Sequence, residues 1–182
     1  MSETRLRKVK EEDLEMIRMW RMHPDITKYM NTDPILTIED QKTWFHNIQQ
    51  NTKVKHWVIQ DKGTDIGMLN LMDIDSVNKR CSWGYYIAEK KFRSLKLAMS
   101  LEWNLYDYVF YELALNKLCN EVLGFNETVA KLHLMCGSDK VGVLKQHIFK
   151  NNEFYDVILI EMCKDKWEKI RGEFSYEKIL FE

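Results

Sequence analysis

Alternating apolar and polar residues predict strands in the first half of the chain. Three such stretches cover residues 56–60, 65–74 and 81–88, and a short polar turn separates each from the next. Residues 4–9 alternate in the same way and predict a first strand. Because short connections usually join antiparallel strands, the pattern predicts an antiparallel meander.

Three longer segments show helical spacing instead. Residues 11–21 place their apolar side chains on one face, and residues 37–50 begin with the capping-box pattern of Thr37 and Asp40. Residues 95–113 contain neither glycine nor proline and carry a continuous apolar stripe. Each of these segments is predicted to be a helix.

The second half of the chain predicts a helical crossover and then a hairpin. Residues 118–123 are short and apolar, which favours an inner strand parallel to the strand at 81–88. The remaining pattern adds a short helix, two hairpin strands and a final helix or arm, at residues 126–137, 141–149, 154–163 and 167–182. The predicted fold is α/β (α+β), a single domain with a mixed, mostly antiparallel seven-stranded sheet and helices on both faces.

Composition limits the classes of partner. The chain has 182 residues and a formal net charge of -1, so it has no general attraction to nucleic acid or anionic membranes. No apolar run approaches the ~20 residues of a membrane helix, and the first residues lack a secretion signal. The four cysteines are scattered without a CxxC pair and are interpreted as small core residues. We expect a cytoplasmic protein without nucleic-acid or membrane partners.

Candidate chemistry begins at a basic loop where the long helix starts. The loop holds four cations, Lys90, Lys91, Arg93 and Lys96. Cations beside the free amides of a helix N-terminus favour a phosphorylated ligand. The alternative is a solvated, lysine-rich turn.

The order of strand, basic loop, long helix, strand, asparagine and short helix resembles the acyl-CoA-binding half of the GCN5-related N-acetyltransferases (GNAT). The loop of that family runs Arg or Gln, two residues, Gly, one residue, then Gly or Ala. Arg93 and Ala98 match its ends, whereas Lys96 stands where Gly is expected. The resemblance implies a GNAT fold, acetyl-CoA as cofactor and no metal. It also implies cofactor contacts from Ile87, Lys91, Phe92, Arg93, Lys96, Leu97, Ala98, Asn126 and Lys131.

Two residues are candidates for catalysis. His133 lies with the apolar stripe of the predicted helix at 126–137, so periodicity alone leaves open a histidine satisfied in the core. The resemblance places it where the family has the Tyr that protonates or hydrogen-bonds the departing coenzyme A sulfur, a task that His can also perform. Glu121 lies on the predicted inner strand, where it either points into the site or faces solvent.

Within the family, the chain is most similar to enzymes that acetylate the UDP-linked 4-amino sugar of pseudaminic acid biosynthesis. The similarity lies in residues 20–24, Phe92, residues 121–122, Asn126 and residues 153–159. It implies direct attack of the sugar amine on the thioester. It also implies substrate contacts from Arg21, His23, Met30, Trp44 and Tyr85.

Other functions stay open at this point. N-terminal acetyltransferases of ribosomal proteins share the fold, and a non-catalytic acyl-CoA-binding domain would accommodate the departures at Lys96 and His133. A structural partner protein would leave the basic loop as plain surface. The sequence also leaves a homodimer open.

Overall fold

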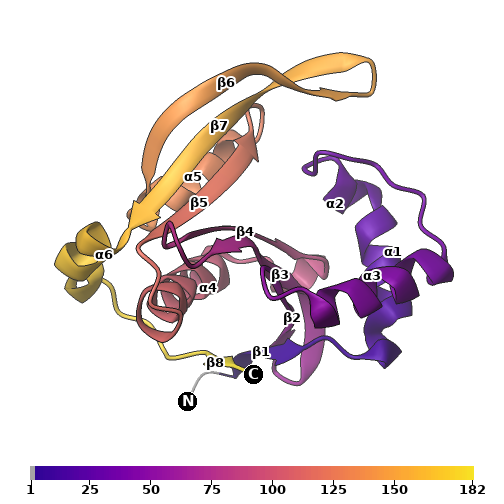
Figure 1. Cartoon of the computed structure of the whole chain (residues 1–182), viewed down its shortest axis with the longest axis horizontal. Coiled ribbons are helices and arrows are strands. Elements are labelled where there is room, and N and C mark those ends of the chain that lie inside the picture. The colour runs from indigo at the N-terminus through magenta and orange to yellow at the C-terminus, as the bar shows by residue number, and fades with distance from the viewer. Residues whose placement is uncertain (1–2) are drawn as a thin grey trace.

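An eight-stranded sheet forms the centre of the computed structural model, which describes residues 3–182 (Figure 1). The strands lie in the order β6-β7-β5-β4-β3-β2-β1-β8. Neighbours are antiparallel except for β4 with β5 and β1 with β8. The strands are β1 (Thr4–Lys8), β2 (Lys55–Asp61), β3 (Thr64–Asp75), β4 (Arg80–Ile87), β5 (Lys117–Leu123), β6 (Asp139–Lys150), β7 (Glu153–Cys163) and β8 (Leu180–Phe181).

Helices cover both faces of the sheet, as predicted. The first face carries α1 (Leu14–Met22), α2 (Pro24–Thr27) and α3 (Ile38–Gln50), and the second carries α4 (Leu95–Asp107) and α5 (Glu127–Met135). Side chains of α1 pack with one set of alternating strand residues and side chains of α4 with the other. The α4 side holds the larger core.

The predicted hairpins and crossover are confirmed. Lys62 and Gly63 both have positive φ in the two-residue turn between β2 and β3, and Asn151 and Asn152 do the same between β6 and β7. Such turns match the right-handed twist of paired strands. The crossover through α4 makes β5 parallel to β4, as expected.

The strand count differs from the prediction, which was seven. The additional strand is β8, which pairs in parallel with β1 near the end of the chain. Only Leu180 and Phe181 belong to it, so no alternating pattern distinguishes it from a charged tail. A final helix or arm is predicted over residues 167–182; the structure has a helix, α6 (Lys164–Ile170), which begins and ends earlier.

The long helix also ends differently from the prediction. Its α-helical part stops at Asp107 and continues as a π-helical turn over Tyr108–Glu112.

No helix within residues 3–182 combines the length and apolar character needed to cross a membrane. The four cysteines are unpaired, and two of them, Cys81 and Cys136, are fully buried.

Candidate active site

The site is built where β4 and β5 separate. These parallel strands pair only from Arg80 with Lys117 to Ser82 with Cys119. At the next position the buried Asn120 side chain donates from Nδ2 to the Trp83 carbonyl oxygen at 3.1 Å. Beyond this bond the ladder between the two strands ends, so the later part of β4 presents its backbone to a gap in the sheet.

A cleft of about 1480 Å³ passes through this gap. One wall comes from α1, α3 and the loop between them. The other wall comes from the start of α4, from β5 and from α5. The cleft therefore connects the two faces of the sheet, which allows two ligands to meet from opposite sides.

The α4 side has the features that a coenzyme A pyrophosphate needs. Ser94 caps α4, and its Oγ accepts the Leu97 amide at 3.2 Å. Arg93 donates from Nε to the Ile87 carbonyl oxygen at 2.8 Å, so the loop cation is fixed to the end of β4. A helix N-terminus with fixed cations beside it favours phosphate.

The predicted cofactor residues fall into two groups. Those that border the cleft are Ile87, Arg93, Ala98, Asn126 and Lys131. Those that lie outside its lining are Lys91, Phe92, Lys96 and Leu97. Asn126 occupies the N-cap position of α5 as predicted, but its side chain accepts no capping hydrogen bond.

Lys96 is compatible with its backbone position. It lies in the first turn of α4, and it is not among the residues with positive φ. Glycine is required only where the backbone enters that region or another group approaches closely. The loop therefore forms its turn without the expected glycine.

His133 is buried and also borders the cleft. The residue is 1% exposed, and its Nδ1 lies 2.9 Å from Oε1 of Glu102, a buried residue of α4. Its ring meets Trp83 edge to face, with 5.2 Å between the ring centroids. His133 therefore has a hydrogen-bond partner in the core, as the structural interpretation of the sequence expects. It also borders the cleft, as a catalytic role requires.

Glu121 is exposed and lines the cleft on the other face of the sheet. Alternation along β5 places Leu118 and Val122 toward α4 and α5, and Glu121 toward α1 and α3. The structure therefore puts the two predicted catalytic side chains on opposite sides of the gap. Both border the same cleft.

The wall toward α1 and α3 includes three of the predicted substrate residues. Arg21, Met30 and Trp44 all border the cleft there. Arg21 is half-buried, and burial lowers the pKa of its guanidinium. It donates to Oγ1 of Thr32 at 2.9 Å, which holds it on the cleft wall.

Two other predicted substrate residues lie elsewhere. His23 is exposed and outside the cleft lining; its Nδ1 accepts the Asp25 amide at the start of α2. Tyr85 borders the cleft but points to the α4 side, stacked on Trp83 at 5.8 Å. The structure therefore separates both from Arg21 and Trp44.

Sequence reasoning missed His56. It lies on β2 and borders the cleft beneath Trp44, with 5.3 Å between the two rings. Burial lowers its pKa to about 4, so the imidazole is neutral at pH 7. The alternation over residues 56–60 predicted the strand. Only the three-dimensional packing shows that the His56 side chain faces the cleft.

The tip of the β6–β7 hairpin is fixed to the loop after α2. Lys150 is buried, and its Nζ donates to the carbonyl oxygens of Thr27 at 2.6 Å and Met30 at 2.9 Å. It also forms an ion pair with Asp33 at 2.9 Å. These three contacts engage all the donors of the ammonium group.

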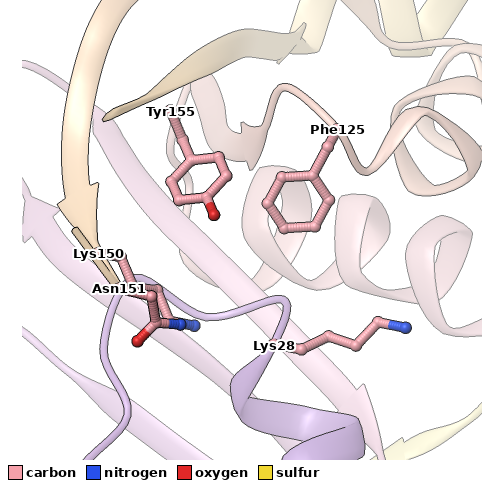
Figure 2. A pocket seen from close by; sticks show the side chains of 5 residues that line it. All are labelled: Lys28, Phe125, Lys150, Asn151 and Tyr155. Carbon is pink, nitrogen blue, oxygen red and sulfur yellow. The ribbon is translucent and has the colours of Figure 1, made fainter. Parts of the chain in front are cut away.

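A smaller pocket of about 240 Å³ lies beside this contact (Figure 2). The rings of Phe125 and Tyr155 form one side of it. Phe125 also stacks on Tyr29, which borders the large cleft. The hairpin is thus in contact with the wall formed by α1, α3 and the loop between them, called the acceptor wall below, through aromatic rings and through Lys150.

Comparison with known proteins identifies the class of enzyme. The model of the acetyltransferase (GNAT) domain matches residues 3–139. The chain belongs to the GNAT acetyltransferase family. It is 25% identical over 134 residues to the SPbeta prophage-derived uncharacterized N-acetyltransferase YokL of Bacillus subtilis (strain 168), covering 73% of this chain and 75% of that protein.

Two further relatives differ in what their names imply. Acetyltransferase PseH of Campylobacter jejuni subsp. jejuni serotype O:23/36 (strain 81-176) is 26% identical over 122 residues, or 67% of this chain and 74% of that protein. The crystal structure of spermidine N-acetyltransferase from Vibrio cholerae in complex with CoA and spermine has a TM-score of 0.85 at 21% identity, covering 91% of this chain and 98% of that one. The second similarity confirms the GNAT fold.

The family and its relatives indicate an enzyme that transfers acetyl groups from acetyl-CoA. They disfavour the non-catalytic domain that the sequence left open. The cleft fits this cofactor, because it runs from the capped start of α4 through the gap beside β4. Arg93, Asn126 and Lys131, three of the predicted cofactor residues, border this cleft.

Proposed function

We propose that the protein acetylates the 4-amino group of a UDP-linked amino sugar by direct attack of that amine on acetyl-CoA. The observation that carries this proposal is Arg21. It lies half-buried on the acceptor wall, and no ion pair within residues 3–182 involves it. The charge of Asp33 acts on this guanidinium from nearby, but no carboxylate of the described residues bonds to it. A half-buried guanidinium of this kind suits an anionic ligand such as a diphosphate.

Aromatic and polar groups on the same wall support this acceptor class. Trp44, Tyr29 and Tyr86 all border the cleft, and flat rings suit a nucleobase or the apolar face of a sugar. The sequence resemblance to enzymes of pseudaminic acid biosynthesis points to the same class.

The chain's own residues have distinct tasks in this proposal. Arg93 and the start of α4 hold the phosphates, and the separated part of β4 positions the thioester through its backbone. Glu121 faces the acceptor side and orients the amine directly or through water. His133 reaches the gap from the other side and supplies the proton that the departing sulfur takes.

A side-by-side assay tests the acceptor. Thiol release from acetyl-CoA is measured with a UDP-4-amino sugar, with spermidine and with an N-terminal peptide of a ribosomal protein. We expect release with the sugar nucleotide. Release only with spermidine or only with the peptide would retain the acetyltransferase and overturn the proposed acceptor.

A variant at Arg21 tests whether this residue binds the acceptor. Arg21→Met removes one charge-assisted contact, so we expect the KM for the sugar nucleotide to rise about tenfold or more. The KM for acetyl-CoA should stay within about twofold. Arg5→Met is the matched control, because Arg5 is an exposed residue of β1 outside the cleft lining. Equal KM values in the two variants would show that Arg21 does not bind the acceptor.

A further inference from the structure

We propose that Glu102 is a positioning residue for acetyl transfer, which holds the His133 ring so that Nε2 serves the cleft. The inference rests on the proposed role of His133. Neither the sequence motifs nor the family resemblance pointed to Glu102. The contact joins two helices, since the residues are 31 positions apart in the chain.

Glu102 is a buried carboxylate that is surrounded by hydrogen-bond partners. Its side chain is 0% exposed, and Oε1 lies 2.9 Å from Nδ1 of His133. Its other oxygen, Oε2, accepts the Tyr106 hydroxyl at 3.1 Å, and that hydroxyl lies 2.9 Å from Oγ of Ser138. Fully buried carboxylates are rare unless each oxygen has a partner, and here both oxygens have one.

The other titratable groups around Glu102 keep their protons. Tyr106 from α4, Tyr85 from β4 and Cys136 at the end of α5 all have raised pKa values. Burial is the main cause in each case, and the nearby charge of Glu102 adds to it. At neutral pH these three groups are uncharged, so none of them adds a charge beside His133.

The contact decides which ring nitrogen does the chemistry. An Nδ1–H that donates to the carboxylate leaves Nε2 as the nitrogen available to a ligand. The edge contact with Trp83 fixes the plane of the ring, and His133 borders the cleft beside the gap in the sheet. Glu102 also opposes the positive charge that the ring carries before it gives up its proton.

The proton balance of the step closes without another reactant. The acceptor nitrogen forms its bond to the acetyl carbon, and the carbon–sulfur bond breaks. His133 gives the proton on Nε2 to the sulfur. The proton that the acceptor nitrogen loses returns to His133 through water, so the ring begins the next turnover in the same state.

Glu102→Gln tests this role, because the amide keeps the shape and removes the charge. We expect kcat to fall roughly tenfold to a hundredfold, with the KM for acetyl-CoA within about twofold. We also expect the alkaline limb of the kcat profile to move to lower pH, because the imidazolium has lost its facing charge. Asn104→Ala is the control: this buried residue lies two positions along α4 but bonds to the C-terminal segment. Its alkaline limb should stay in place even if the protein is less stable.

A double variant shows whether Glu102 acts through His133. His133→Phe should lower kcat, and adding Glu102→Gln should lower it no further. A further loss in the double variant would overturn the proposal, as would an unchanged alkaline limb in Glu102→Gln.

A measurement without an acceptor separates this inference from the proposed function. Nitrogen NMR of the full chain labelled on histidine reports the tautomer of His133 directly. We expect a proton on Nδ1 in the unsubstituted protein, whether or not Nε2 also carries one, and an unprotonated Nδ1 would overturn the inference. If no sugar nucleotide is acetylated, the kinetic test uses whichever amine is, and the NMR result stands by itself.

Discussion

At the scale of single residues, burial sets the charge state of groups along the acceptor wall. His56 shows this effect most clearly. Burial lowers its pKa from 6.5 to about 4, and its ring contacts Trp44 rather than a charged partner. A neutral imidazole in a cleft that binds amines avoids repelling a protonated acceptor.

The same shift predicts an acid-dependent loss of stability. The folded state resists protonation of His56 until pH 4, whereas the unfolded chain takes up that proton near pH 6.5. Stability is therefore fully present above pH 6.5 and falls as the pH drops toward 4, by roughly 3 kcal/mol for this group. His56→Asn should lose this part of the pH dependence. Urea unfolding of both proteins between pH 4 and 7 measures the difference, and parallel curves would contradict the prediction.

The sequence could name some site residues and not others, for physical reasons. The family resemblance pointed to Asn126 and His133 through their spacing after a predicted strand, and both border the cleft. Glu102 depends on a contact between two helices, which local spacing does not encode. One signal was present: Glu102 follows Ala98 by four positions, so it lies on the same helical stripe as the core residues.

At the scale of elements, the hairpin tip has a buried anchor. Lys150 comes from the end of β6 and bonds to the loop that follows α2, far away in the sequence. Figure 1 shows the β6–β7 hairpin extending toward α2. The Met30 carbonyl that Lys150 engages belongs to a residue lining the acceptor wall. The hairpin therefore supports the shape of that wall.

Removing the anchor should loosen both parts. Lys150→Met deletes three contacts and leaves two carbonyl groups without their donor, so we expect a loss of about 2 kcal/mol. Hydrogen exchange should become faster at residues 149–154 and 27–33, and the KM for the acceptor should rise. Lys145→Met is the matched control, since that lysine pairs with Asp156 on the same hairpin but is exposed. Equal exchange in the two variants would show that Lys150 does not hold the tip.

Elements with strong local signals were predicted, and those that depend on distant partners were missed. The turns contain Gly63 and Asn151, residue types that tolerate positive φ, and both hairpins formed as expected. Strand β8 exists because β1 offers an edge and because Phe181 stacks on Tyr108 at 4.4 Å. Neither partner is near it in the sequence.

At the scale of the whole molecule, the C-terminal segment closes the core beneath α4. Asp107, at the end of α4, forms hydrogen bonds with three side chains of this segment. Its carboxylate accepts Trp167 Nε1 at 2.9 Å, Arg171 Nε at 2.7 Å and the Tyr176 hydroxyl at 2.9 Å. Burial works against the charge of Asp107, but these three donors lower its pKa below the ordinary value.

We predict that the Asp107 carboxylate contributes to the stability of the fold. Asp107→Asn removes the charge that faces Arg171 and weakens two further bonds, so we expect a loss of about 2 kcal/mol. For a chain of this size that loss lowers Tm by about 4–8 °C.

In the unsubstituted protein this stabilisation is present above the ordinary pKa of an aspartate and is lost as the pH falls through the depressed pKa. Thermal melts at pH 7 and at pH 3 should therefore differ less in the variant. Asp75→Asn is the control, because Asp75 accepts hydrogen bonds from Asn78 within the exposed turn that follows β3. If Asp107→Asn melts with the unsubstituted protein, the segment is held by its buried Trp167 and by β8 rather than by the carboxylate.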